Sequence, residues 1–455
     1  MTSTVYDLPA EPSVPRASSG TLSGWGRFPT VPGVEHASER LDEVTRDVPL
    51  TRGLGRAYGD AALPAAGDLR VAGSSRADRM LAFDTGSGEL TAEAGLTLDE
   101  VYRVFLPRGF FTPVSPGTRF VTLGGMVASD VHGKNHHGAG TFGRYVRSLK
   151  IRVADGRIVS CSRTRDAELF RATLGGMGLT GHLLEVTVTL ARVPSPWIVE
   201  ETERIPDIGA FVDALKAASR EWPMTVGWID CLSRRPALGR GILYRGRWAE
   251  AHEAPAGFPH LGSSIPVPFT MPDRVLDPFV VRTFNAVNYR LHGRRTKRRV
   301  VHPKNFFYPL DAIGGWNLLY GQRGFAQYQC VLPNSASHGA ASRFLDLLTA
   351  RGGASFLCVI KDCGAEGDGL LSFPKPGISI ALDIPMRAGT QSLVDALNEL
   401  VIREGGRIYL AKDALTRPDH FRAMEPRLDE FLRVRRQWDP QGRIRSAQSV
   451  RLFGW

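Results

Sequence analysis

The sequence has no long apolar run and no recognisable secretion signal. No stretch of about 18 consecutive apolar residues occurs in the chain, so a membrane-spanning helix is not expected. The first twenty residues, MTSTVYDLPAEPSVPRASSG, lack a basic segment followed by an apolar one, and we interpret residues 1–20 as a disordered tail. These absences predict a cytoplasmic protein. Peripheral contact with the inner face of the membrane stays open.

Cysteine is scarce, and the few cysteines do not form a recognisable pattern. Five are present, an odd number without metal-ligand spacing: Cys161, Cys231, Cys330, Cys358 and Cys363. This arrangement favours free thiols in a reducing compartment over a disulfide framework, and no metal site is expected. The sequence also lacks internal repeats, while 49 glycines and 30 prolines predict many turns between short elements.

Acidic residues are fewer than basic ones, 46 Asp and Glu against 57 Lys and Arg, which leaves a formal net charge of +11. The densest basic segment is RLHGRRTKRR at 290–299. Such a run is typical of a solvated loop, but it would also suit an anionic membrane surface or a phosphate-bearing substrate. No nucleic-acid-binding motif accompanies it, so no nucleic-acid partner is expected.

Secondary-structure signals change character after Pro194-Ser195-Pro196. Before this point, glycine-punctuated strands dominate, with a helix from Leu98 to about Leu106 capped by Thr97 or Asp99 and a hairpin turn at Asp155-Gly156. We interpret 234–305 as basic, proline-rich loops. Strands and helices are expected at 197–202, 208–219, 225–231, 327–332, 341–351, 355–361, 378–384, 390–404, 418–424 and 428–437.

These signals predict an α+β protein. We expect a tail at 1–20, a first domain at 21–194, a second domain at 195–404, and a C-terminal segment at 405–455 that returns to the first domain.

Three glycine-rich segments carry the strongest functional signal: GLGRAYGD (53–60), PGTRFVTLGGMVA (116–128) and LGGMGLTG (174–181). Glycine lets the backbone approach a ligand closely, and consecutive backbone N–H groups can bind a pyrophosphate. Directly after the second segment, SDVHGKNHHG (129–138) places three imidazoles and an ammonium in a loop. Close-approach glycines beside groups that can hold or move protons are typical of a redox cofactor site.

Together with ADGRIVS…DAELFRATLGGMGLTG and IYLAKD…RVRRQWDPQGR, these segments resemble the vanillyl-alcohol-oxidase (PCMH-type) FAD-binding superfamily. Within it, the chain is similar to the decaprenylphosphoryl-ribose oxidase family, the FAD subunits of a ribose 2-epimerase. The resemblance runs from Leu22 to about Arg451. It implies an FAD domain of two α+β subdomains and an α+β substrate domain with an antiparallel sheet.

The resemblance also implies individual residue roles. FAD would be bound by Gly53, Gly55, Arg56, Ala57, Tyr58, Pro116, Gly117, Thr118, Gly124, Gly125, Ala128, Ser129, His132, Gly178, Leu183 and Tyr409. The substrate pocket would contain His132, Lys134, Trp228, Gln327, Gln329, Lys361 and Lys412.

Oxidation of a secondary alcohol needs a hydride acceptor, the flavin N5, and a group that takes the hydroxyl proton. His132 is our candidate base or orienting group, because imidazole titrates near neutrality. Lys412 is the second candidate, either as the base or as a fixed cation. His136 and His137 are interpreted as loop structure.

Some residues depart from the family pattern. Many covalently flavinylated relatives carry a histidine where this chain has Arg56, which predicts non-covalent FAD. The family has Cys and Asn where this chain has Ala381 and Ser379, and Tyr in place of Phe307. The identity of the sugar is therefore open.

We expect an FAD-dependent oxidoreductase that oxidises the 2-hydroxyl of a polyprenylphosphoryl-β-D-ribose to a ketone in arabinan precursor synthesis. A separate NADH-dependent short-chain reductase would complete the epimerisation. One alternative is an aldonolactone or alditol oxidase, and another is a non-catalytic polyanion-binding protein.

Overall fold

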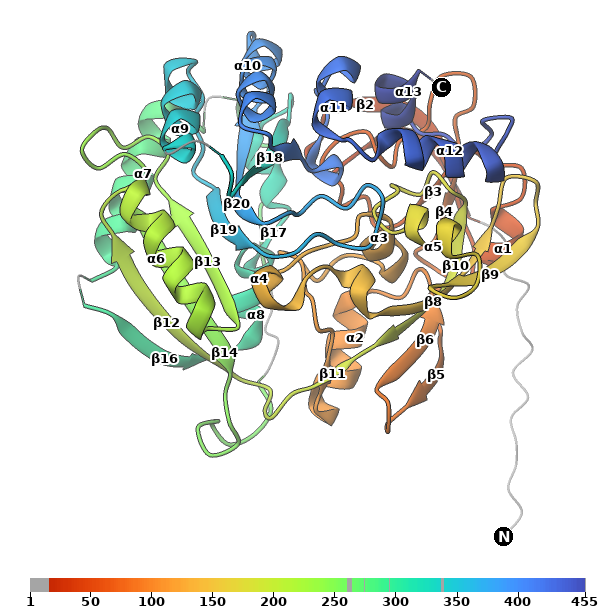
Figure 1. The fold of residues 1–455 in the computed structure, drawn as a ribbon, viewed down its shortest axis with the longest axis horizontal. Helices are drawn as coiled ribbons and strands as arrows, with labels where there is room; N and C mark the ends of the chain where they lie inside the picture. The colour runs from red at the N-terminus through yellow and green to blue at the C-terminus, as the bar shows by residue number, and fades with distance from the viewer. Residues whose placement is uncertain (1–15, 260–263, 274, 294, 337–338, 455) are drawn as a thin grey trace.

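The computed structural model describes residues 16–259, 264–273, 275–293, 295–336 and 339–454. Two halves lie side by side, with helices and largely antiparallel sheets in each, so the protein is α+β as predicted (Figure 1). None of the described helices combines the length and apolar character that crossing a bilayer requires.

The N-terminal half begins with a four-stranded sheet in the order β1-β2-β4-β3. Its strands are β1 (Arg16–Ser23), β2 (Thr30–Ala37), β3 (Thr51–Arg52) and β4 (Arg70–Gly73), with the short helix α1 (Leu41–Val44) beside them. The expected tail at 1–20 is therefore wrong at residues 16–20, which pair antiparallel with β2. Their small polar residues gave no apolar alternation, but backbone hydrogen bonds suffice for an edge strand. Residues 1–15 lie outside the described part.

A five-stranded antiparallel sheet completes this half, in the order β5-β6-β10-β8-β9. The strands are β5 (Met80–Asp84), β6 (Glu89–Glu93), β8 (Val146–Arg152), β9 (Ile158–Ser162) and β10 (His182–Thr189). The predicted Asp155-Gly156 turn joins β8 to β9. Helices α2 (Leu98–Phe105), α3 (Leu123–Ala128) and α5 (Ala167–Thr173) bury apolar residues in the same core, and Thr97 and Glu100 form a capping box on α2.

The second half is built on one eight-stranded antiparallel sheet in the order β16-β12-β14-β13-β19-β20-β18-β21. Its strands are β12 (Ile198–Ile205), β13 (Met224–Ile229), β14 (Gly241–Trp248), β16 (Lys297–Val301), β18 (Phe325–Pro333), β19 (Cys358–Cys363), β20 (Gly377–Pro385) and β21 (Arg407–Ile408). Helices α6 (Ile208–Glu221), α9 (Ala340–Ala350) and α10 (Thr390–Arg403) pack against it and bury one apolar core (Figure 1).

Strand β18 shows how this packing creates a site. Tyr328 points to the helices, where its ring stacks on Phe344 and its hydroxyl donates to Asn398. Gln327 and Gln329 must point to the other face, because side chains alternate along a strand. The face of the sheet that the helices leave free therefore carries polar side chains.

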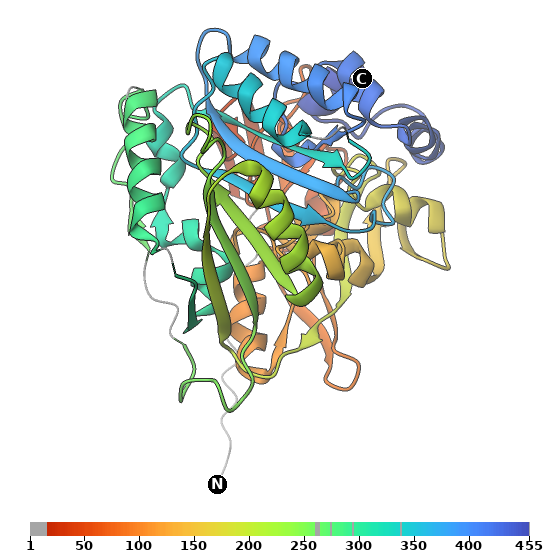
Figure 2. The same cartoon turned by 60° about the vertical axis from the view of Figure 1, so that its left-hand side comes forward.

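The prediction of loops throughout 234–305 is wrong. The segment contains β14, β16 and the helix α7 (Pro278–Leu291), which stands on the outside of the molecule as the green helix at the left of Figure 2. Apolar residues of α7 lie on its exposed face, whereas a surface helix normally buries them. The sequence of α7 therefore lacks the pattern expected of a helix that packs on a soluble core. Part of the basic run 290–299 is edge strand β16 rather than loop.

The remaining elements are short. They are β7 (Phe110–Phe111), β11 (Ala191–Arg192), β15 (Ile265–Pro266), β17 (Ile313–Gly314), α4 (His136–Ala139), α8 (Pro303–Phe307), and the 3-10 helices η1 (Leu106–Arg108), η2 (Phe142–Tyr145), η3 (Pro309–Ala312), η4 (Trp316–Tyr320) and η5 (Leu410–Lys412).

The C-terminal residues contact the first half again. The sequence signals anticipated α11 (Pro418–Met424) and α12 (Leu428–Trp438) but not α13 (Ala447–Phe453). From α13, Arg451 forms an ion pair with Asp60 at 2.8 Å, and it also reaches Asp413 at 2.8 Å. These contacts fix the end of the chain beside the first glycine-rich segment.

Candidate active site

A cavity of about 1050 Å³ lies where the glycine-rich segments meet the free face of the eight-stranded sheet. Pockets for drug-sized ligands span about 300–1,000 Å³. The cavity therefore has room for a large nucleotide cofactor and a substrate together.

Every residue that the sequence assigned to a site lines this cavity. The cofactor set is Gly53, Gly55, Arg56, Ala57, Tyr58, Pro116, Gly117, Thr118, Gly124, Gly125, Ala128, Ser129, His132, Gly178, Leu183 and Tyr409, and the substrate set is His132, Lys134, Trp228, Gln327, Gln329, Lys361 and Lys412. The structure brings the residues together, and their individual roles stay predictions.

The glycine-rich segments leave room for a ligand rather than for protein atoms. Gly117 and Gly178 both line the cavity, yet a Cβ added at either would meet no atom within 4 Å. Gly178 also has a φ of 78°, a left-handed conformation that favours glycine. Bare backbone facing open space is what a cofactor needs to approach closely.

Arg56 stands at the cavity wall with its guanidinium carbon 4.0 Å from the ring centroid of Trp25 and 5.3 Å from that of Phe120. Its Nε is buried without a hydrogen-bond partner. Burial lowers the pKa of Arg56, which a nearby carboxylate, Asp311, partly offsets. Buried polar atoms are almost always paired, so this nitrogen is suited to an acceptor supplied by a ligand.

His132 is held by a residue of the second half of the chain. Gln329 Nε2 lies 2.9 Å from His132 Nε2 and also donates to the Ser379 hydroxyl at 2.9 Å. His132 Nδ1 and Gln329 Oε1 are buried without partners. Burial holds the pKa of His132 well below its usual value, and Lys361, His136 and Lys412 add to this shift. The imidazole is therefore neutral at physiological pH.

Lys412 carries the other candidate group. Burial, with Lys361, lowers the pKa of Lys412 to about 7, against the opposing effect of Asp383. Its Nζ lies 5.6 Å from the ring centroid of Tyr58. At neutral pH a large fraction of this amine is unprotonated, which is the form that can accept a proton.

Asp383 was missed by the sequence analysis, although a lone carboxylate in the apolar strand ISIALDIP was a usable signal. It accepts hydrogen bonds from Tyr320 at 2.8 Å and from Gln327 Nε2 at 2.5 Å. Burial raises its pKa. Asp383 thus orients Gln327 and sets part of the electric field at Lys412.

Two more lysines line the cavity. Lys134 Nζ donates to the carbonyl of Phe306 and, at 3.3 Å, to that of Phe307, and burial lowers its pKa to about 7. Burial also lowers the pKa of Lys361. Trp228 is fixed by a bond of 2.9 Å from Nε1 to the Phe356 carbonyl. An anionic ligand would stabilise the charged forms of these two amines, which burial disfavours.

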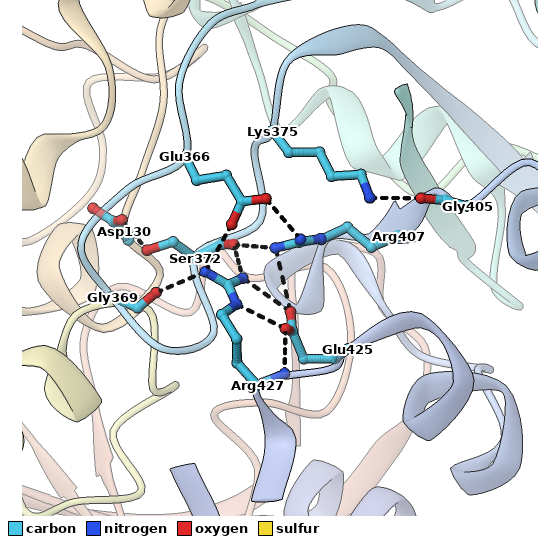
Figure 3. Close-up of polar contacts among 9 residues, drawn as sticks. All are labelled: Asp130, Glu366, Gly369, Ser372, Lys375, Gly405, Arg407, Glu425 and Arg427. Carbon is cyan, nitrogen blue, oxygen red and sulfur yellow. Dashed lines mark hydrogen bonds and ion pairs between the residues drawn. The ribbon is translucent and has the colours of Figure 1, made fainter. Parts of the chain in front are cut away.

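The loop that carries His132 is anchored from behind by buried charges, shown in Figure 3. Ser372 donates to Asp130, and the Ser372 carbonyl accepts from Arg427 at 2.8 Å and from Arg407 at 3.2 Å. Glu425 pairs with Arg427 at 2.9 Å and with Arg407 at 3.5 Å. The C-terminal segment therefore holds the loop at 129–138 in place.

The remaining histidines of this loop serve as structure, in line with their interpretation. His136 Nδ1 accepts from the Gly364 amide at 3.0 Å, and His137 Nε2 lies 2.9 Å from the Trp222 carbonyl. The three positions that differ from the family pattern also lie at the site. Ala381 and Phe307 line the cavity, and Ser379 contacts Gln329.

Comparison with known proteins agrees with this geometry. A family described as "FAD binding domain" matches residues 44–162, which include the first two glycine-rich segments. Decaprenylphosphoryl-β-D-ribose oxidase of Mycolicibacterium smegmatis is 36% identical over 452 residues, or 95% of this chain and 97% of that protein. The chain belongs to the decaprenylphosphoryl-β-D-ribose oxidase family. It is accordingly an FAD-dependent oxidoreductase.

Other relatives cover less of the chain. An uncharacterised protein of Streptomyces coelicolor is 32% identical over 375 residues, which is 78% of this chain and all of that protein. L-Gulonolactone oxidase of Bos taurus is 32% identical over 127 residues, 28% of each chain. The similarity to the decaprenylphosphoryl-ribose oxidase family thus extends over both halves, whereas the similarity to the lactone oxidase covers a part.

The residues that line the cavity are suited to bind FAD. Bare glycines at Gly117 and Gly178 leave space at the backbone, and the unpartnered Arg56 nitrogen suits a phosphate oxygen. The residues of the cofactor set are those that would hold it.

Proposed function

We propose that the protein oxidises the 2-hydroxyl of a polyprenylphosphoryl-β-D-ribose to the ketone, in arabinan precursor synthesis. The observation that carries this proposal is the lining of one cavity. It combines bare glycines, three lysine amines, and apolar side chains that include Val280, Phe284 and Leu319. A ligand with a sugar, a phosphate and an apolar chain would meet a suitable partner for each part.

Bound FAD would supply the acceptor for the hydride that leaves the sugar carbon. We propose that it is held non-covalently, because Arg56 stands where flavinylated relatives have histidine and offers an ion-pairing guanidinium instead. The four-stranded and five-stranded sheets would form the two subdomains of a PCMH-type fold around it.

Lys412 is the proposed proton acceptor. Its pKa near 7 leaves much of the amine unprotonated at neutral pH, so it can take the hydroxyl proton and become an ammonium. His132 is a poorer base, because burial depresses its pKa. We therefore reverse the order expected from the sequence and assign His132 to orienting the hydroxyl.

Lys134 and Lys361 are proposed to receive the phosphate. An anionic oxygen would restore their charged forms, which burial alone disfavours. Gln327 and Gln329 present unpartnered Oε1 atoms that can accept from sugar hydroxyls.

The keto product needs a second enzyme. We propose an NADH-dependent short-chain reductase as the partner that delivers hydride to the opposite face of the sugar and so inverts the carbon. Association with a membrane surface, where a polyprenyl substrate resides, belongs to the same proposal.

An aldonolactone or alditol oxidase is the second candidate, favoured by the partial similarity to L-gulonolactone oxidase. Anaerobic titration separates the two. Polyprenylphosphoryl ribose should bleach the flavin absorbance, whereas free lactones and alditols should leave it unchanged. Bleaching by the soluble compounds alone would overturn the proposed function.

A further inference from the structure

Helix α7 has an exposed face that is apolar. Phe279 and Leu291 are each 75% exposed, Phe284 is 49% exposed, and Val280 and Val287 are exposed beside them. Positions 280, 284, 287 and 291 follow helical spacing, so they form one stripe along the helix. A surface helix of a soluble protein normally presents polar residues there.

The orientation of α7 is fixed by its other side. Val281, Asn285 and Tyr289 are buried against the substrate half. Asn285 Nδ2 donates to Asp230 at 3.0 Å, and the Tyr289 hydroxyl donates to the Ile205 carbonyl at 3.3 Å. Because these buried polar contacts fix the rotation of the helix, the apolar stripe must face outward.

The stripe lies at the opening of the cavity. Val280 and Phe284 are exposed, yet they also line the cavity, so the cavity reaches the surface beside α7. Ile265, which is 77% exposed, pairs with Ile313 between the short strands β15 and β17, and Ile313 also lines the cavity. We call the stripe and these two residues the apolar rim.

Exposed basic residues lie on α7 and in the segment directly after it. Arg282 and Arg290 on α7, then Arg295 and Lys297, are exposed, and within the described residues they form no ion pair. The nearby acids are engaged: Asp277 caps α7, and Asp273 pairs with Arg323 at 3.2 Å. Helix α7 and the segment after it therefore carry uncompensated positive charge in addition to the apolar stripe.

We propose that the apolar rim docks on an anionic lipid bilayer, with α7 lying in the headgroup region and the cavity opening toward the acyl chains. An amphipathic helix with basic flanks and exposed aromatic residues binds such surfaces. A symmetric contact between two copies would instead bring the same basic residues together, which is unfavourable. The choice of a lipid-linked substrate rests on the proposed function, whereas the docking itself does not.

Vesicle co-sedimentation tests the docking without any catalytic reaction. The FAD-loaded full chain is mixed with vesicles of phosphatidylcholine alone or with phosphatidylglycerol added, and flavin absorbance is followed in the pellet. The protein should prefer the anionic vesicles at least tenfold, and added salt should weaken binding. F279S/L291S, which changes the two most exposed apolar residues of α7, both outside the cavity lining, should lower the partition coefficient at least tenfold.

Two further variants complete the test. Ile158→Ser removes an exposed apolar residue of β9, on the other half, and should bind like the wild type. R282S/R290S should lose the preference for anionic vesicles. Absence of wild-type binding, or full binding by F279S/L291S, would overturn the docking. So would self-association in light scattering that F279S/L291S abolishes. A protein that binds vesicles but is not reduced by polyprenylphosphoryl ribose would refute only the proposed function.

Discussion

The side-chain amide nitrogen of Gln329 lies 2.9 Å from Nε2 of His132, so a residue of the second half holds an imidazole of the N-terminal half. The contact joins two parts of the chain 197 positions apart. It gives the ring a fixed orientation, while burial keeps the ring neutral. The two halves are thereby aligned at the point where the substrate hydroxyl is expected.

If His132 orients the hydroxyl, His132→Ala should slow anaerobic flavin reduction by roughly 10–100-fold while FAD is retained. The pH dependence of the remaining rate should match that of the wild type. His137→Ala, which changes a histidine of the same loop outside the cavity lining, serves as the control and should react normally. A lost pH inflection in His132→Ala would instead identify His132 as the proton acceptor.

If Lys412 is the proton acceptor, its pKa sets the pH at which the rate changes. Because the amine must be unprotonated to accept a proton, kcat/KM should fall as the pH drops below about 7, the pKa of Lys412. Lys412→Met should lower the rate of flavin reduction by about 10²–10⁴-fold and remove the inflection. Lys134→Met should keep the inflection and raise KM, since Lys134 is assigned to the phosphate. An inflection that survives in Lys412→Met would contradict the assignment.

Gly125→Leu tests the cofactor cradle. Gly125 lies in α3, and an added Cβ would come within 4 Å only of Thr122 Oγ1, at 3.1 Å. Leucine also favours a helix by about 1 kcal/mol over glycine, so the apo-protein should fold. The side chain would enter the cavity, and FAD content should fall at least tenfold. Gly138→Leu, outside the cavity lining with no atom within 4 Å of its Cβ, should keep full FAD content. Equal FAD content in the two variants would move this segment away from the cofactor.

Substitution of Glu425 tests whether the buried charge cluster stabilises the loop at 129–138. Its side chain is 4% exposed and that of Arg407 is 5% exposed, so Glu425→Gln leaves a buried cation poorly compensated. The loss of stability should be about 3–5 kcal/mol. Glu430→Gln breaks an exposed pair with Arg171 and should cost at most about 1 kcal/mol. Thermal unfolding of the two FAD-loaded variants provides the measurement, and similar midpoints would show that the cluster does not anchor the loop.

Non-covalent binding has a direct test as well. Denaturation in acid should release all the yellow colour into the supernatant after the protein is pelleted. Arg56→Ala should weaken FAD binding, because the guanidinium that faces the cavity is lost. Colour that stays with the precipitated chain would establish a covalent bond.

Local signals in the sequence identified most of the elements. Thr97 caps α2 and Asp155-Gly156 turns β8 into β9, because a cap and a two-residue turn depend on residues adjacent in the chain. The alternation of Gln327 and Gln329 placed both on one face of a strand. Their cavity contacts depend on the packing of two distant segments, and only the family resemblance brought those segments together in advance.

The errors have a common physical origin. Helix α7 was interpreted as a loop because its outward face is apolar, and a sequence pattern does not tell which side of a helix meets solvent. Residues 16–20 of strand β1 fall within the expected tail because their pairing uses the backbone and not the side chains. Asp383 was overlooked because its role depends on Tyr320, 63 positions away.

The contact between Tyr409 and Ser129 has a consequence for biosynthesis. The Tyr409 hydroxyl donates to the Ser129 carbonyl at 3.0 Å, and Arg451 reaches back to Asp60. A nascent chain emerges from the ribosome N-terminal end first, so the glycine-rich segments are exposed long before the residues that close over them. Flavin capture should therefore follow release of the finished polypeptide rather than accompany its translation.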